Sequence, residues 1–254
     1  GKAAVEALAK LVLQYEADPK TAGVVVGLGL LNEPSAAYMN ETRAFYEEMV
    51  PKLRASLPAE RYFLMLGWMD SPHAKSAGWF AEMRAKDPSN FAAVVYDVHL
   101  YHGFGDNTAP WTADQDYCKT CCRDAHILKP IVDVDVPVVI GEYGVFTGFN
   151  GWAQGKFIET NLANQLSLWN TANNVVGSFM WNYRILIDPW WPKQSFEWSL
   201  VDLISEGYLQ PDFAYKADVS RLCPAMADKV SHQCPDYSQT TVIFATKCAW
   251  RPPA

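Results

Sequence analysis

The chain alternates between amphipathic segments and short stretches that are apolar almost throughout. Residues 2–15 carry apolar side chains three and four positions apart, which predicts a helix with one buried face. Residues 23–31 form a nearly unbroken apolar run after the Asp18-Pro19-Lys20 helix stop. Continuous rather than alternating hydrophobicity is typical of a strand that is buried on both faces of a parallel sheet. A helix followed by a buried strand is therefore the first predicted unit.

The same two patterns recur further along the chain. Buried strands are predicted at residues 62–66, 92–99, 137–141 and 175–181, and helices at 42–57 and 156–170. Strands separated by helices predict an α/β fold with a parallel sheet. After Pro211 the chain becomes rich in Cys and Pro. We therefore predict an α/β domain over residues 1–211 and a C-terminal extension over residues 212–254 that packs on it.

Polar residues of the kinds found in active sites follow four of the predicted strands. They are Asn32-Glu33-Pro34 after the first strand, His99-Leu100-Tyr101-His102 at the third, Glu142-Tyr143-Gly144 after the fourth and Trp181-Asn182 at the fifth. In a (β/α)8 barrel the carboxyl ends of the strands converge on one face, where the active site lies. The shared register of the four motifs therefore predicts the α/β class with a (β/α)8 TIM-barrel architecture.

Glu33 and Glu142 are the two carboxylates in these motifs. Glycoside hydrolysis needs such a pair, because one carboxyl must hold a proton for the leaving oxygen while the other stays ionised. Carboxyl groups about 5 Å apart give a covalent glycosyl-enzyme and retention of configuration, whereas a wider gap admits a water molecule and gives inversion. The residues alone leave both stereochemical outcomes open.

Four motifs together resemble the successive active-site motifs of glycoside hydrolase family 5. They are Leu31-Asn32-Glu33-Pro34, His99-x-Tyr101, Ile140-Gly141-Glu142-Tyr143 and Phe179-Met180-Trp181. Within this family the pattern is similar to that of fungal-type exo-β-1,3-glucanases, with further likeness at residues 97–104, 196–200 and 207–211. The resemblance covers about residues 24–211 and implies a retaining β-glycosidase of β-glucan that uses no cofactor and no metal.

The resemblance also implies a role for each motif residue. Glu33 is expected to be the general acid/base, and Glu142 the nucleophile. Asn32 is expected to donate to the sugar 2-hydroxyl, while His99 and Tyr101 hydrogen-bond around the carboxylates. Trp181 is expected to form the floor of the subsite next to the scissile bond. Further stacking platforms are equally open to a purely packing role: Trp68, Trp190, Trp191 and Trp198.

Two departures from the family pattern concern the shape of the subsites. Tyr143 follows Glu142 where the fungal enzymes usually carry Trp, and the loop over residues 184–193 is longer than expected. Both bear on exo action and on the β-1,3 preference rather than on the hydrolytic chemistry. An endo-acting cellulase or mannanase of the same family is therefore an alternative.

The position of Glu33 near the start of the chain predicts an incomplete barrel. Each βα unit takes about 30 residues, so an acid/base after the fourth strand has about 100 residues before it. Here one helix and one strand precede Glu33, which leaves roughly the C-terminal five βα units. The family's missing strands carry an Arg and a His that support the nucleophile. We expect the N-terminal half of the barrel to come from the same precursor or from another chain.

The incomplete barrel also leaves a second class of function open. The alternative to an enzyme is a non-catalytic glucan-binding or structural protein.

The six cysteines fall into two groups, with Cys118, Cys121 and Cys122 in a loop and Cys223, Cys234 and Cys248 in the C-terminal segment. Disulfides from loop to tail would fix the extension, and six cysteines allow 15 pairings. A metal site built from Cys118, Cys121 and His126 is the rival interpretation. With the Asn40-Glu41-Thr42 glycosylation sequon, the even cysteine count favours a secreted protein, either free or associated with a cell wall.

Charge and hydropathy exclude two classes of partner. The formal net charge is −7, without clusters of Lys and Arg, which excludes a nucleic-acid-binding surface. No apolar run is long enough to span a bilayer. Among the remaining histidines, His73 and His232 are predicted at the surface, and His102 is a candidate for lining the cleft.

Overall fold

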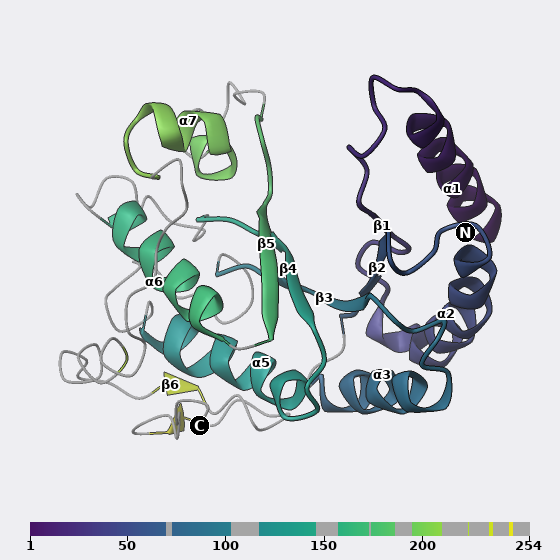
Figure 1. Cartoon of the computed structure of the whole chain (residues 1–254). Helices are drawn as coiled ribbons and strands as arrows, with labels where there is room; N and C mark the ends of the chain where they lie inside the picture. Colours follow the sequence, from purple (N-terminus) through teal and green to yellow (C-terminus); the bar gives the residue numbers. More distant parts are fainter. Residues whose placement is uncertain are drawn as a thin grey trace. The chain divides into compact units, whose positions relative to one another are not determined.

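The computed structural model describes residues 1–69, 73–102, 117–145, 157–172, 174–185, 195–209, 223, 234–235 and 244–245. The chain divides into two compact units. The first comprises Gly1–Val98 and Pro130–Val139, and the second His99–Lys129 and Ile140–Ala254. Figure 1 labels the α-helices and the strands β1 to β6. The predicted boundary at residue 211 lies outside the described residues.

Five strands form one sheet whose order follows the chain. They are β1 (Gly27–Gly29), β2 (Phe63–Gly67), β3 (Val94–Leu100), β4 (Val138–Tyr143) and β5 (Val175–Met180). β1 pairs with β2, and β2 with β3, in parallel, with Leu64 opposite both Leu28 and Val94. Parallel strands in chain order with helical connections are the arrangement of a partial (β/α)8 barrel. A separate antiparallel pair joins β6 (Cys234–Pro235) to β7 (Phe244–Ala245).

Helices precede, connect and follow the strands of the sheet. They are α1 (Lys2–Ala17), η1 (Ala36–Tyr38), α2 (Met39–Arg54), α3 (Ala74–Lys86), the π-helix η2 (Cys118–Asp124), α5 (Ala125–Val132), α6 (Phe157–Thr171), η4 (Ser195–Trp198) and α7 (Leu200–Ser205). Within the described ranges, no helix combines the length and the apolar character needed to cross a membrane.

The first unit is built on an aromatic core between α2, α3 and the strands. The ring of Trp68 lies 5.2 Å from the rings of both Tyr46 and Trp79 and stacks at 6.2 Å on Tyr96. The hydroxyl of Tyr46 donates to the carbonyl of Gly67 at 2.8 Å, so its buried polar atom is satisfied. Rings in such contacts stabilise a core beyond the area they bury.

Arg54, at the end of α2, connects this helix to the loops before β2 and β3. Its guanidinium donates to the backbone carbonyls of Leu57, Tyr62, Asn90, Ala92 and Ala93 at 2.7–3.1 Å. Carbonyl groups outside a strand ladder need such partners. Arg54 therefore has a purely structural role in the first unit.

The predicted helices and strands are confirmed, with one difference in length. The run at residues 23–31 yields only three residues of strand in β1, and Val24 before it is 69% exposed. β5 also leaves Val176 63% exposed, whereas six of the seven residues of β3 are buried. β1 and β5 are the outer strands of the sheet, which explains why burial on both faces holds for β3 and fails for them.

The prediction that His73 lies at the surface is wrong. Its side chain is buried at the start of α3, and its Nδ1 lies 2.7 Å from the hydroxyl of Tyr96. The same hydroxyl contacts Ser76 Oγ. The reason is that the first turn of α3 packs against β3, which brings a polar histidine next to a buried phenol. His232 lies outside the described residues.

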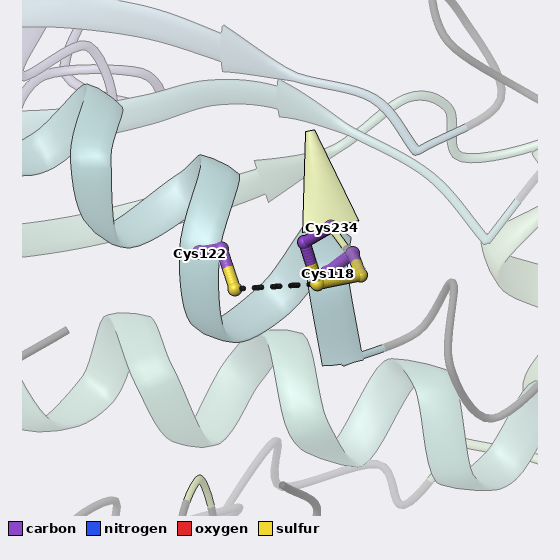
Figure 2. Close-up of a disulfide and its surroundings, with 3 residues drawn as sticks. All are labelled: Cys118, Cys122 and Cys234. Carbon is purple, nitrogen blue, oxygen red and sulfur yellow. Dashed lines mark hydrogen bonds between the residues drawn. A yellow bond between two sulfur atoms is a disulfide. The ribbon is translucent and has the colours of Figure 1, made fainter. Parts of the chain in front are cut away.

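Two disulfides connect the loop cysteines to the C-terminal segment, as predicted. Cys118 is bonded to Cys234, and Cys121 to Cys223, across 116 and 102 residues of sequence. Cys122 is also disulfide-bonded, and its sulfur lies 3.8 Å from that of Cys234 (Figure 2). Cys248 lies outside the described residues. Cys118 and Cys121 are disulfide-bonded and offer no thiolate to a metal ion, so the rival prediction of a metal site with His126 is wrong.

Removal of the first disulfide is expected to destabilise the chain. The double variant Cys118→Ala/Cys234→Ala should lose about 2–5 kcal/mol of unfolding free energy, because a long loop is no longer closed in the unfolded state. Denaturant unfolding followed by circular dichroism measures this loss. In excess reductant the difference from the parent chain should vanish. An equal loss with and without reductant would show that packing of the sulfurs, rather than the covalent bond, stabilises this region.

Candidate active site

The Asn32-Glu33-Pro34 motif follows β1 in the first unit. The amide of Leu30 donates to the carbonyl of Met65 at 3.1 Å, which continues the pairing with β2 just past β1. Gly67 at the end of β2 lies against this segment, since a Cβ atom there would come 2.8 Å from the carbonyl oxygen of Leu31. Only a glycine allows this close approach. The end of β2 thus helps to fix the backbone just before Asn32.

Glu33 is exposed and has a backbone φ of 43°, in the left-handed region. Non-glycine residues adopt this conformation rarely, and such residues are concentrated at functional sites. Asn32 beside it is also exposed. The placement leaves both side chains accessible to a ligand, as the predicted roles require.

Glu142 lies in β4, in the second unit, and has two partners from the end of β3. Tyr101 donates its hydroxyl hydrogen to Glu142 Oε2 at 2.7 Å, a short hydrogen bond of the kind that ionised acceptors form. His99 Nδ1 lies 3.5 Å from the same oxygen, which is beyond ordinary hydrogen-bond length. The side chain of Glu142 remains 16% exposed. The structure thus brings His99 and Tyr101 next to Glu142, with Tyr101 in hydrogen-bond contact with the carboxylate.

Aromatic side chains surround this carboxylate in the second unit. The ring of Trp198 lies 5.4 Å from that of Tyr101, and a Cβ atom on Gly144 would lie 3.6 Å from both rings. The amide of Trp181 donates to the carbonyl of Tyr143 at 2.8 Å, which ties the end of β5 to the end of β4. The side chain of Trp181 is 49% exposed, so one part of it is free to stack on a ligand.

The other tryptophan candidates have different outcomes. Trp68 is 3% exposed within the aromatic core of the first unit, and its burial favours packing over a platform role. Trp198 is half-buried against Tyr101. Trp190 and Trp191 lie outside the described residues, as does most of the predicted 184–193 loop.

The expectation that Tyr143 shapes a subsite is wrong. Its side chain is completely buried, and its ring lies 4.8 Å from that of Trp169 in α6. Successive side chains of a strand point to opposite faces, so Tyr143 points away from the face that carries Glu142. The Trp-to-Tyr departure is therefore a change in core packing between β4 and α6.

Sequence reasoning missed a chain of buried polar groups next to Tyr101. Nε2 of His102 lies 2.9 Å from Oδ2 of Asp124, and both side chains are fully buried. Arg123 donates from Nε and Nη2 to Oδ1 of Asp124 at 3.0 and 2.7 Å. Burial opposes the ionisation of Asp124, but the charge of Arg123 and the hydrogen bonds from His102 and Arg123 outweigh it and hold the pKa of this carboxyl below its ordinary value. His102 is thus a core residue, and its predicted place in the cleft is wrong.

Comparison with known proteins identifies the class. Residues 4–184 match the family model described as cellulase (glycosyl hydrolase family 5), so the chain belongs to glycoside hydrolase family 5. It is 24% identical over 169 residues to the probable glucan 1,3-beta-glucosidase A of Emericella nidulans, a match that covers 66% of this chain. The chain spans 38% of the length of that relative.

A solved structure is also similar to this chain. It is the GH5 xyloglucanase of Bacteroides ovatus in complex with an XXXG heptasaccharide, with 13% identity and a TM-score of 0.44. The similarity covers 78% of this chain and 47% of that one. Membership in the family, together with five strands in chain order, confirms the predicted fold class as part of a (β/α)8 barrel.

Proposed function

We propose that this chain is the C-terminal part of a retaining β-glycosidase that hydrolyses β-1,3-glucan from a chain end. Glu142 attacks the anomeric carbon and forms a covalent glycosyl-enzyme. Glu33 protonates the leaving oxygen in the first step and removes a proton from the attacking water in the second. Asn32 binds the 2-hydroxyl of the sugar, and Trp181 stacks on its apolar face.

The observation that carries the proposal is the short hydrogen bond from Tyr101 to Glu142 in a chain of this family. A nucleophilic carboxylate has to be held in one orientation, and a hydroxyl donor at 2.7 Å provides such a fixed contact. His99 adds a second polar neighbour on the same oxygen. The half-exposed ring of Trp181 at the end of the adjacent strand offers the flat apolar surface that a sugar requires.

The substrate class rests on the relative and not on a bound sugar. The relative's name describes a glucan 1,3-beta-glucosidase, and this supports a β-1,3-glucan substrate with release of single glucose units. A secreted protein, free or associated with a cell wall, is the matching localisation. The disulfides support it, because such bonds persist in oxidising compartments. Asn40 is exposed in α2, and a glycan could be attached there.

We further propose that three more βα units, from the same precursor or from a second chain, complete the barrel. Both outer strands expose large apolar side chains that a complete barrel would cover. Val24 and Val26 before β1 are 69% and 50% exposed, and Val176 and Phe179 of β5 are 63% and 51% exposed. A parallel sheet with open edges otherwise associates with other chains.

The test is hydrolysis of a laminarin-type β-1,3-glucan, with the chain alone and with the additional βα units supplied. The completed barrel should release glucose, and proton NMR of the first turnovers should show the β-anomer, because a double displacement retains configuration. The chain alone should be slower by at least about 10²-fold, since the substrate is poorly held. Release of oligosaccharides from cellulose or mannan would favour an endo-acting enzyme. Binding of glucan without cleavage would favour the non-catalytic alternative.

A further inference from the structure

We infer that Arg123 and Asp124 of η2 are positioning residues for the proposed nucleophile and that they act through Tyr101. The inference rests on the proposed function of Glu142, and it adds two residues outside the strand-end motifs. All the groups involved belong to the second unit, and their contacts form one continuous chain of hydrogen bonds.

Tyr101 is the link between η2 and Glu142. Nη1 of Arg123 donates to the backbone carbonyl of Tyr101 at 2.8 Å, while the hydroxyl of Tyr101 donates to Glu142 at 2.7 Å. Tyr101 comes directly after the last residue of β3, so the strand ladder does not fix its backbone. The guanidinium of Arg123 therefore fixes the backbone of Tyr101, and the carboxylate of Glu142 accepts the hydrogen bond from its hydroxyl.

Asp124 in turn fixes the guanidinium. Two nitrogens of Arg123 donate to Oδ1 of Asp124, which leaves the third nitrogen to reach Tyr101. The planar guanidinium has donors in a fixed arrangement, so the contact with Asp124 orients the contact with Tyr101. Asp124 is fully buried and the side chain of Arg123 is 13% exposed. A buried charge without its partner is strongly destabilising, so the pair stays closed in the folded protein.

The opposite side of Asp124 is anchored to α6 through His102. Oδ2 of Asp124 lies 2.9 Å from Nε2 of His102, whose Nδ1 lies 3.2 Å from Nδ2 of Asn161. Oδ1 of Asn161 accepts from Nε2 of Gln165 one turn further along the helix. With the amide of Asn161 as donor, His102 carries its proton on Nε2 and donates it to Asp124. His102 and Asn161 therefore each donate one hydrogen bond and accept another within this chain.

η2 is a suitable anchor because it is itself held by the disulfides. Cys118 and Cys121, in the same helix as Arg123, are bonded to Cys234 and Cys223. The position of the tyrosine hydroxyl over Glu142 thus depends on a covalently fixed helix rather than on a free loop. Preorganised donors of this kind are what stabilises charge at a reacting centre.

The test compares Arg123→Lys and Arg123→Gln with the parent in the completed barrel. In Arg123→Gln, kcat for a β-1,3-glucan should fall about 10-fold to 100-fold because the tyrosine is misplaced, while KM changes less than about twofold. Arg123→Lys keeps a cation beside Asp124 but lacks the planar group that reaches Tyr101, so it should recover only part of kcat. Arg54→Lys is the matched control, since Arg54 binds carbonyls only in the first unit. It should lower stability and leave kcat unchanged.

A second readout does not depend on activity. With 3-fluorotyrosine at position 101, the fluorine NMR signal should move when Glu142→Gln is introduced into the parent chain. This response should shrink at least about threefold in the Arg123→Lys background, since the hydroxyl is no longer held on the carboxylate. An unchanged response together with an unchanged kcat would overturn the inference. A reduced response in a protein that cleaves no glycoside would instead sustain the positioning role and overturn the proposed function.

Discussion

Glu142→Gln is expected to lower the turnover of a β-1,3-glucan by at least about 10³-fold, the scale of loss when a nucleophile is removed. The amide has nearly the shape of the carboxylate, so Tyr101 can still donate to an oxygen at this position. A neutral amide cannot form the glycosyl-enzyme, however. Glucose release measured with the purified completed barrel gives the loss directly. Because the packing is retained, the unfolding free energy should change by no more than about 1 kcal/mol.

Glu159→Gln is the matched control for this experiment. Glu159 lies exposed in the first turn of α6, in the same unit as Glu142, so the exchange has the same chemistry without contact to the site. It should leave both turnover and stability unchanged. If Glu142→Gln retained more than about a tenth of parent activity, the loss would fall far below that of a removed nucleophile, and another residue would have to be the nucleophile.

The order and type of the strands could be predicted because strands that are buried on both faces consist almost entirely of apolar residues. Residues 92–99 are apolar almost throughout, and β3 is correspondingly buried on both faces. The same reasoning overextended the first strand, since Val24 and Val26 before Gly27 are apolar but lie exposed beside an outer strand. An apolar run predicts burial on both faces of a strand that has neighbours on both sides. The outer strands have a neighbouring strand on one side only, so part of their apolar surface stays exposed.

The site was predictable only where it coincides with strand ends. Tyr101 and Glu142 belong to motifs at the ends of β3 and β4, and the structure brings them into contact. Arg123 and Asp124 lie in a helix, and nothing in their spacing from Tyr101 indicates that they support it. Their relation depends on how η2 folds back onto the end of β3, which is a property of tertiary packing.

The Tyr143 position illustrates the opposite error. Its place next to Glu142 in the motif indicated a role in the subsite, but neighbouring residues of a strand face opposite sides. The alternation in β4 leaves Glu142 partly accessible and buries Tyr143 against Trp169. Strand periodicity was therefore a better guide to this residue than its proximity in sequence to the catalytic motif.

Glu33→Gln should separate the two steps of the proposed reaction. Hydrolysis of a glucan with a sugar leaving group should fall about 10²-fold to 10⁴-fold, because the leaving oxygen is no longer protonated. A β-glucoside of 2,4-dinitrophenol needs no such protonation, so its first step should keep close to the parent rate. A burst of dinitrophenol, followed by slow turnover, would show the glycosyl-enzyme accumulating for lack of a general base.

Azide distinguishes this variant from the nucleophile variant. It is a strong nucleophile that needs no general base, so it should restore the turnover of the dinitrophenyl glucoside by Glu33→Gln and give the β-glucosyl azide. The product retains configuration because azide attacks the glycosyl-enzyme on the face opposite to Glu142. Glu60→Gln, an exposed carboxylate of the same unit, should show neither the burst nor the response to azide. Glu33→Gln could instead hydrolyse both the glucan and the dinitrophenyl glucoside at the rates of the parent chain. This result would show that Glu33 takes no part in the reaction, because hydrolysis slows when a sugar leaving group is not protonated.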